Sequence, residues 1–73
     1  MFYDIYFDDR WGDSRFIGSC EKENVWSTIS DWIKKIAPNF KIYYVRSWEA
    51  NGVIHYDVSS HTEFFRAVPI GNN

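Results

Sequence analysis

The chain has 73 residues, and ten acidic and eight basic side chains give it a net charge of −2. This length predicts a single small domain over residues 1–73, and the charge balance makes nucleic acid an unexpected partner. No apolar run approaches the roughly 18 residues of a membrane-spanning helix, and the acidic first segment differs from a signal peptide, so we expect no membrane association.

The first two predicted elements form a β-hairpin. Residues 2–8 alternate with period two, so Tyr3, Ile5 and Phe7 would point to one side of a strand and polar neighbours to the other. A turn-rich link follows this strand. Residues 14–19 predict a second short strand that pairs with the first.

An amphipathic pattern predicts a helix over residues 22–37. At about 100° per residue the apolar side chains of this segment fall within an arc of about 140°. They are Val25, Trp26, Ile29, Trp32, Ile33, Ile36 and Ala37. Pro38 and Asn39 are residue types that end a helix.

The second predicted hairpin spans residues 40–58 and turns at Asn51-Gly52. Asn-Gly between β-rich runs is typical of a type I′ turn, in which both central residues take positive φ. The strands would be residues 40–48 and 53–58. A two-residue loop places Trp48 opposite His55, and Arg46 opposite Asp57.

A last strand is predicted over residues 62–68, and we expect the tail 69–73 to fray. The order is then ββαβββ, an α+β fold with one mostly antiparallel sheet and a single helix packed on one face. The predicted core contains Ile5, Phe7, Ile29, Ile33, Ile36 and Val45.

The predicted register sorts the second hairpin into two faces. The face expected to receive the helix carries Tyr43, Val45, Ile54, Tyr56 and Val58, and the other carries Ile42, Tyr44, Arg46, Trp48, His55, Asp57 and Ser59. The second set has two interpretations. Its cross-strand pairs could simply stabilise the sheet, or Tyr44, Arg46, Trp48, His55 and Asp57 could form a binding surface.

The sequence gives no support for catalysis, a metal or a cofactor. The serines and the single cysteine, Cys20, lack an elbow motif such as G-x-S-x-G. A metal site would need His55, Asp57, His61 and Glu63, whose spacing matches no known ligand pattern. We therefore expect a chain that is not an enzyme, and we expect His61 and Thr62 to cap the turn before the last strand.

The segment from Tyr43 to Phe65 resembles small uncharacterised proteins encoded by phages and prophages of Gram-positive bacteria. The resemblance is carried by YYVRSW at 43–48 and SHTEFF at 60–65, and the strand and helix that precede them are also similar. It implies no activity and no site residue. It does imply a context, because small phage accessory proteins often bind and disable host proteins, including antiviral defence factors.

Two functional hypotheses follow. The first is a phage accessory protein that binds a host or phage protein, with inhibition of a defence factor as the expected effect and a second copy of the chain as another partner. The second is a small-ligand or nucleotide-binding module, in which Arg46, Trp48 and His55 grip an anionic aromatic ligand. Since Cys20 allows no internal disulfide, the expected compartment is the reducing bacterial cytoplasm.

Overall fold

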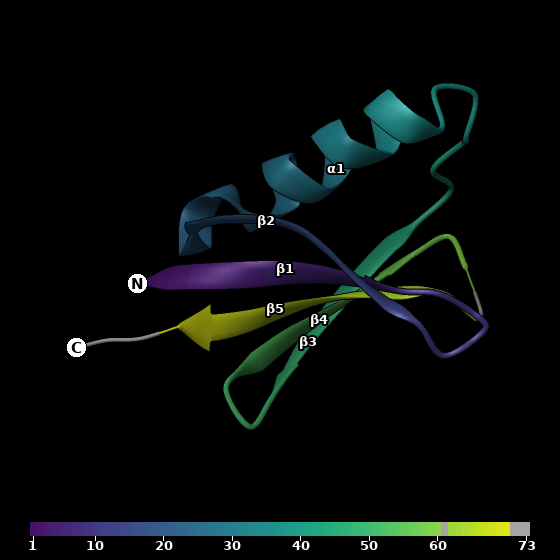
Figure 1. Ribbon diagram of the computed structural model, residues 1–73. Coiled ribbons are helices and arrows are strands. Elements are labelled where there is room, and N and C mark those ends of the chain that lie inside the picture. Colours follow the sequence, from purple (N-terminus) through teal and green to yellow (C-terminus); the bar gives the residue numbers. More distant parts are fainter. Residues whose placement is uncertain (61, 71–73) are drawn as a thin grey trace.

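The computed structural model describes residues 1–60 and 62–70 and shows an α+β fold (Figure 1). The elements are β1 (Phe2–Asp8), β2 (Ser14–Glu21), the 3-10 turn η1 (Lys22–Asn24), α1 (Val25–Ile36), β3 (Val45–Ala50), β4 (Val53–Val58) and β5 (Phe64–Ile70). The predicted order ββαβββ and the single antiparallel sheet are confirmed.

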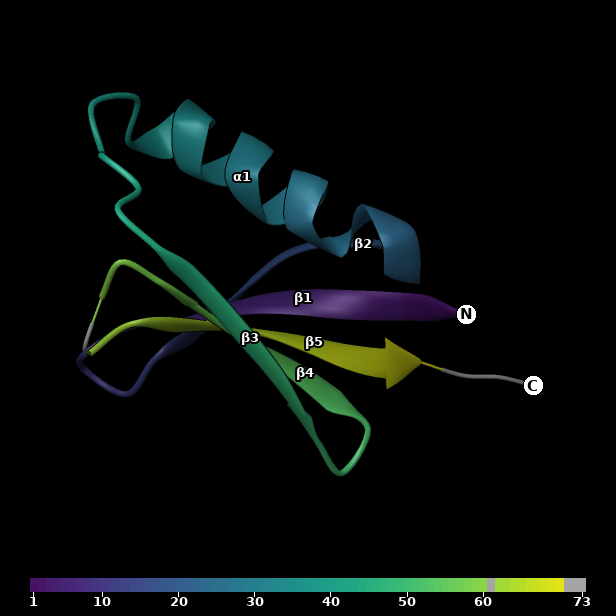
Figure 2. The ribbon, with the colours of Figure 1, turned by 180° about the vertical axis from the view of Figure 1, so that it is seen from behind.

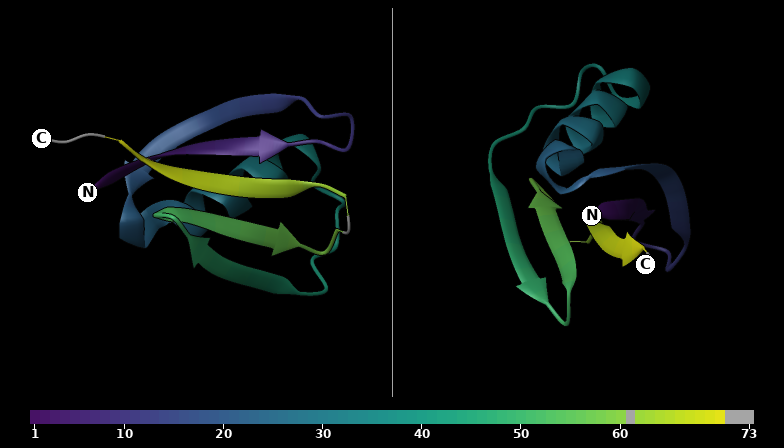
Figure 3. Two further views of the ribbon diagram at one scale, coloured as in Figure 1. Left: turned by 90° about the horizontal axis from the view of Figure 1, so that it is seen from below. Right: turned by 90° about the vertical axis from the view of Figure 1, so that its left-hand side faces the viewer.

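The sheet has five strands in the order β2-β1-β5-β4-β3 (Figure 3, left). Every neighbouring pair is antiparallel. The last strand of the chain therefore lies at the centre, between β1 and β4, and joins the two hairpins. The edges are formed by β2 and β3.

The core lies between α1 and the sheet. Its buried residues are Tyr3, Ile5, Val25, Ile29, Ile33, Val58, Phe65 and Ala67. Aromatic contacts extend it on both sides, with ring centroids 5.2 Å apart for Phe7 and Trp32 and 6.1 Å apart for Trp26 and Tyr56. Figures 1 and 2 show α1 above the strands from opposite directions.

The predicted core is correct for Ile5, Ile29 and Ile33, and wrong for Ile36 and Val45. Phe7 is only partly buried. Ile36 is 53% exposed because it lies in the last turn of α1, beyond the buried cluster, and Val45 is 42% exposed because it begins an edge strand whose residues are all exposed. The apolar pattern extends further along the chain than the core does.

Several predicted boundaries are also wrong. Residues 40–44 are not part of β3, because the chain uses them to pass from the end of α1 to the far edge of the sheet (Figure 2). Tyr43, assigned to the helix-facing side, is 80% exposed there. Pro69 and Ile70, expected to fray, pair with Tyr3 and Phe2 in β5, whereas 71–73 lie outside the described residues.

The predicted turn and register of the β3–β4 hairpin are confirmed. Asn51 has a φ of 54° and Gly52 a φ of 82°, as a type I′ turn requires. Arg46 lies opposite Asp57, and Trp48 lies opposite His55.

Truncation of Ile33 should reveal where the helix meets the core. Ile33 is 7% exposed, so Ile33→Ala should lower the free energy of unfolding by about 2–5 kcal/mol. The matched variant Ile36→Ala, three residues along the same helix, should cost about 1 kcal/mol or less. Urea unfolding of both variants measures the difference, and equal losses would contradict the observed helix face.

The second turn residue should tolerate only side chains that accept positive φ. A Cβ at Gly52 would have room, since its nearest neighbour is Pro69 Cγ at 3.9 Å, so the φ of 82° decides the outcome. Gly52→Val should cost about 1–3 kcal/mol and Gly52→Asn distinctly less, because Asn adopts this backbone region more readily. Thermal unfolding of the two variants measures which one is less stable. Equal melting temperatures would contradict a positive φ at Gly52.

Candidate functional site

Trp48 and His55 stack across β3 and β4 on the sheet face that points away from α1, here called the outer face. Their ring centroids are 5.4 Å apart and their planes differ by 13°. Trp48 remains 47% exposed, so one part of the indole is held by His55 while the rest faces solvent. The predicted position of Trp48 opposite His55 is confirmed, and the two rings stack.

Asp57 lies beside this pair and is fully buried. Its carboxylate accepts a hydrogen bond from the Arg46 guanidinium and another from the Ser60 amide at 3.3 Å. The Tyr44 hydroxyl is 3.4 Å from both carboxylate oxygens, and the Arg46 guanidinium lies over the Tyr44 ring at 5.5 Å. Because Asp57 has no exposed surface, it can orient Arg46 but cannot itself contact a partner.

The surroundings of Asp57 keep it ionised. Burial by itself would raise the pKa of Asp57, but the hydrogen bonds from Arg46 and the Ser60 amide, together with the guanidinium charge, hold it below its usual range. The Arg46 side chain is 66% exposed. In this ion pair the Arg46 guanidinium is therefore exposed to solvent, while the Asp57 carboxylate that holds it is buried.

Ser59 holds the segment before β3 in place. Its hydroxyl accepts hydrogen bonds from the amides of Tyr43 and Tyr44, at 2.7 and 3.0 Å, and donates to the Tyr44 carbonyl at 3.0 Å. Ser59 has a φ of 53°. This one side chain positions Tyr44 next to Asp57 even though Tyr44 is not in a strand.

The stacked pair is one end of a row that crosses the whole sheet. His55 is opposite Arg66 in β5, and Arg66 lies over the ring of Tyr6 in β1 at 4.8 Å. Tyr6 meets Phe16 of β2 edge-on, with centroids 5.8 Å apart. We call these residues the cross-sheet row: Trp48, His55, Arg66, Tyr6 and Phe16.

A bulge in β2 brings Phe16 into this row. Ile5 pairs with Gly18 but Tyr6 pairs with Phe16, so Ile17 is an extra residue at that point. Ile17 packs against the core, whereas Phe16 is 55% exposed. Because of the extra residue, Ile17 faces the core and Phe16 faces the outer side of the sheet.

Arg66, like Arg46, is paired with a carboxylate. It donates to both oxygens of Asp8, from Nε at 2.7 Å and from Nη2 at 3.1 Å, and to the Ser14 hydroxyl at 3.1 Å. Burial opposes ionisation of Asp8, but the hydrogen bonds from Arg66 and Ser14 outweigh it and lower the pKa of Asp8. Both arginines are therefore fixed and locally neutralised, unlike a basic patch for phosphates.

Of the predicted binding residues, the structure brings together all five: Tyr44, Arg46, Trp48, His55 and Asp57. Tyr6, Arg66 and Phe16 were not identified as site residues from the sequence. They come next to the predicted residues only because of the order of the strands in the sheet. One signal was available in the sequence, since the alternation of residues 2–8 places the aromatic Tyr6 on the polar side of its strand.

The alternative metal set does not assemble among the described residues. In residues 1–60 and 62–70 there is no group of three or more His, Cys, Asp or Glu side chains arranged to hold a metal. His61, a member of that set and a predicted turn cap, lies outside the described residues. The hydroxyl of Ser60 accepts hydrogen bonds from the amides of Thr62 and Glu63.

A small-ligand site needs a concave surface. Two pockets, of about 180 and 390 Å³, are lined by residues that include Phe7, Trp32 and Ile36, and neither is lined by Arg46, Trp48 or His55. Arg46, Trp48 and His55, which were expected to bind an anionic aromatic ligand, therefore lie outside both pockets.

Compared with known protein families, with curated proteins and with solved structures, the chain gives no match. In the part of the chain that the structure describes, no helix combines the length and apolar character needed to cross a membrane.

The buried carboxylate makes stability depend on pH. The pKa of Asp57 is lowered on folding, so its contribution is full above the usual value of 3.8 and is lost as the pH falls through the lower folded pKa. Asp57→Asn should cost about 1–3 kcal/mol at pH 7, and the variant should lose less stability than the wild type between pH 6 and pH 2. Urea unfolding at each pH checks this, and parallel pH profiles would show that Asp57 is not held as described.

Proposed function

We propose that the chain is a protein-binding domain that works through the outer face of its sheet, with Trp48 as the central anchor. The observation that carries this proposal is the cross-sheet row, in which aromatic rings and a fixed arginine are aligned on one face across all five strands. Trp, Tyr and Arg are the residue types that dominate binding energy at protein interfaces.

The apolar exposure of the outer face supports binding over mere sheet stabilisation. Trp48 and Phe16 at the two ends of the row are each about half exposed, and so is Phe2, which shares the strand parity of Tyr6. Aromatic cross-strand pairs also stabilise a sheet by themselves, so it is the exposed area of these three rings that supports a partner. Apolar groups gathered on one face are typical of a surface that a partner covers.

The order of the two arginines also supports binding. Arg46 and Arg66 are held by Asp57 and Asp8, so their guanidinium groups lose little freedom when a partner contacts them. The half-exposed indole of Trp48 is likewise restrained by His55. A surface already ordered in this way has a smaller entropic cost of association.

The partner we propose is a protein of a bacterial host, bound by a phage accessory protein and inhibited by it. The resemblance of residues 43–65 to phage and prophage proteins supports this context. Cys20 is a free thiol, which suits the reducing cytoplasm where such a partner would be met.

A pair of tryptophan variants tests the proposal. Trp11 is 80% exposed in the turn between β1 and β2, away from the cross-sheet row, and serves as the matched control for Trp48. The tagged wild type is used to capture and identify partners from a lysate of a Gram-positive host, and the affinity of the purified partner is then measured for Trp48→Ala and Trp11→Ala.

Trp48→Ala should weaken binding by at least about 2 kcal/mol, roughly thirtyfold in Kd, while Trp11→Ala binds like the wild type. Both variants should melt within a few degrees of the wild type. Unchanged affinity of Trp48→Ala, or its failure to fold, would place the working surface elsewhere.

A further inference from the structure

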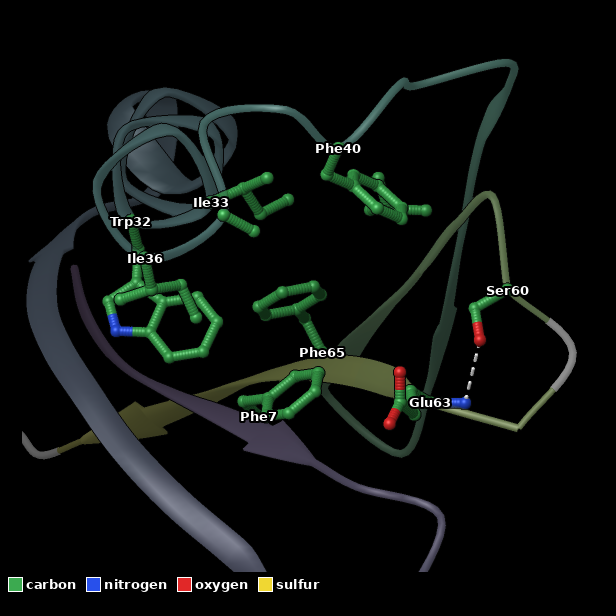
Figure 4. A pocket seen from close by; sticks show the side chains of 10 residues that line it. Phe7, Trp32, Ile33, Ile36, Phe40, Ser60, Glu63 and Phe65 are labelled. Atoms are coloured by element: carbon green, nitrogen blue, oxygen red, sulfur yellow. Dashed lines mark hydrogen bonds between the residues drawn. The ribbon is translucent and has the colours of Figure 1, made fainter.

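A hollow remains where the apolar side of α1 extends past the core. Ile36 is 53% exposed and Phe40 is 44% exposed, although both belong to an apolar stretch of the chain. Together with Phe7, Trp32 and Phe65 they surround a pocket of about 180 Å³. Figure 4 shows the rings of Phe7 and Phe65 on the sheet side and the helix side chains facing them.

The volume of this pocket matches one ring. An apolar cavity of about 150 Å³ is large enough to bind benzene, so 180 Å³ accommodates a phenyl group or a side chain of similar size. Pockets for whole small-molecule ligands are usually about 300–1,000 Å³. The apolar pocket by itself is below this range, so it accommodates one apolar side chain, and the adjoining hollow of about 390 Å³ has room for the residues on either side of it.

One side of the pocket is polar. Ser60 and Glu63 line it, and the Ser60 hydroxyl accepts the Glu63 amide hydrogen at 3.1 Å, as the dashed line in Figure 4 marks. The Glu63 carboxylate receives a hydrogen bond from Arg10 Nε at 3.3 Å and its side chain is 30% exposed. The carboxylate is therefore ordered and still open to solvent.

A second hollow continues the first toward the β1–β2 turn. It shares Phe7, Trp32 and Ile36 with the first pocket and is also lined by Asp9 and Asp13. The Asp9 carboxylate is fixed by hydrogen bonds from the amides of Trp11 and Asp13, at 2.8 and 3.0 Å. Among the described residues, Arg15 is the one basic residue that lines either hollow, against the carboxylates of Asp9, Asp13 and the Arg10-paired Glu63.

We infer that these two hollows form a docking groove for a segment of another protein that inserts a phenyl-sized apolar side chain beside Trp32 and places basic residues next to it. The apolar walls provide the site for the ring. The carboxylates of Asp9 and Asp13 favour lysine or arginine over acidic neighbours, whereas Glu63 is already paired with Arg10. This groove is separate from the outer face, so the inference does not depend on the proposed role of Trp48.

Three short peptides test the groove on the full chain: acetyl-Lys-Phe-Lys-amide, acetyl-Glu-Phe-Glu-amide and acetyl-Lys-Ala-Lys-amide. Their binding is followed by NMR from the indole N–H signals, with Trp32 as the reporter of the groove and Trp48 as the reporter of the outer face. The Lys-Phe-Lys peptide should shift the Trp32 signal in a saturable way, without moving that of Trp48. The Glu-Phe-Glu peptide should bind at least about fivefold more weakly than the Lys-Phe-Lys peptide. The Trp32 shift caused by the Lys-Ala-Lys peptide should not saturate.

The variant Asp13→Asn tests the contribution of the carboxylates to this preference. Within residues 1–60 and 62–70 the Asp13 side chain makes no hydrogen bond that the fold would lose. The variant should therefore reduce the preference for the basic peptide while leaving the melting temperature unchanged. Absence of a saturable Trp32 shift with Lys-Phe-Lys would overturn the groove. Equal affinity for the basic and acidic peptides, or a response at Trp48 instead of Trp32, would overturn the assigned occupant.

Discussion

A single helix of twelve residues packs on a sheet of five strands, and most features of the molecule depend on this difference in size. Such a helix is about 18 Å long and roughly 10 Å wide. Five strands spaced by about 4.8 Å make a sheet roughly 20 Å across, with two faces. The helix can therefore cover only part of one face, and the buried cluster is confined to Tyr3, Ile5 and the residues near them on β4, β5 and α1.

The uncovered face is stabilised by pairs that keep it ordered in water. Charges are neutralised in place, with Asp57 beside Arg46 and Asp8 beside Arg66. The rings of the cross-sheet row contact one another in two pairs, Trp48 with His55 and Tyr6 with Phe16. Such a surface is aromatic and close to electrically balanced. In the proposed function these properties suit a protein partner.

The part of the structure that depends on local sequence could be predicted. The Asn51-Gly52 turn sets the register of its hairpin, and this alone brought Trp48 to His55 and Arg46 to Asp57. The centre of the helix was equally readable, since Ile29 and Ile33 lie where its apolar side meets the sheet. In each case neighbours in sequence determine neighbours in space.

The errors all concern long-range arrangement. Nothing in residues 64–70 says that this strand lies between β1 and β4, so the contacts of Arg66 with Tyr6 and Asp8 could not be foreseen. Val45 and Ile36 have the apolar character of core residues, but the first lies on an edge strand and the second beyond the end of the buried cluster. An apolar residue is buried only if another element is close enough to cover it.

The central claim is that the outer face is open in the free protein and becomes covered when a partner binds. The four tryptophans report on it directly, because Trp11 and Trp48 are exposed whereas Trp26 and Trp32 are partly buried. The decisive measurement is ¹⁹F NMR of protein labelled with 5-fluorotryptophan, in the presence of a soluble paramagnetic probe, before and after addition of the captured partner. The account predicts strong broadening of the Trp11 and Trp48 signals in the free protein and protection of Trp48, but not Trp11, in the complex. A Trp48 signal that is already protected in the free protein, or that stays broadened in the complex, would contradict it.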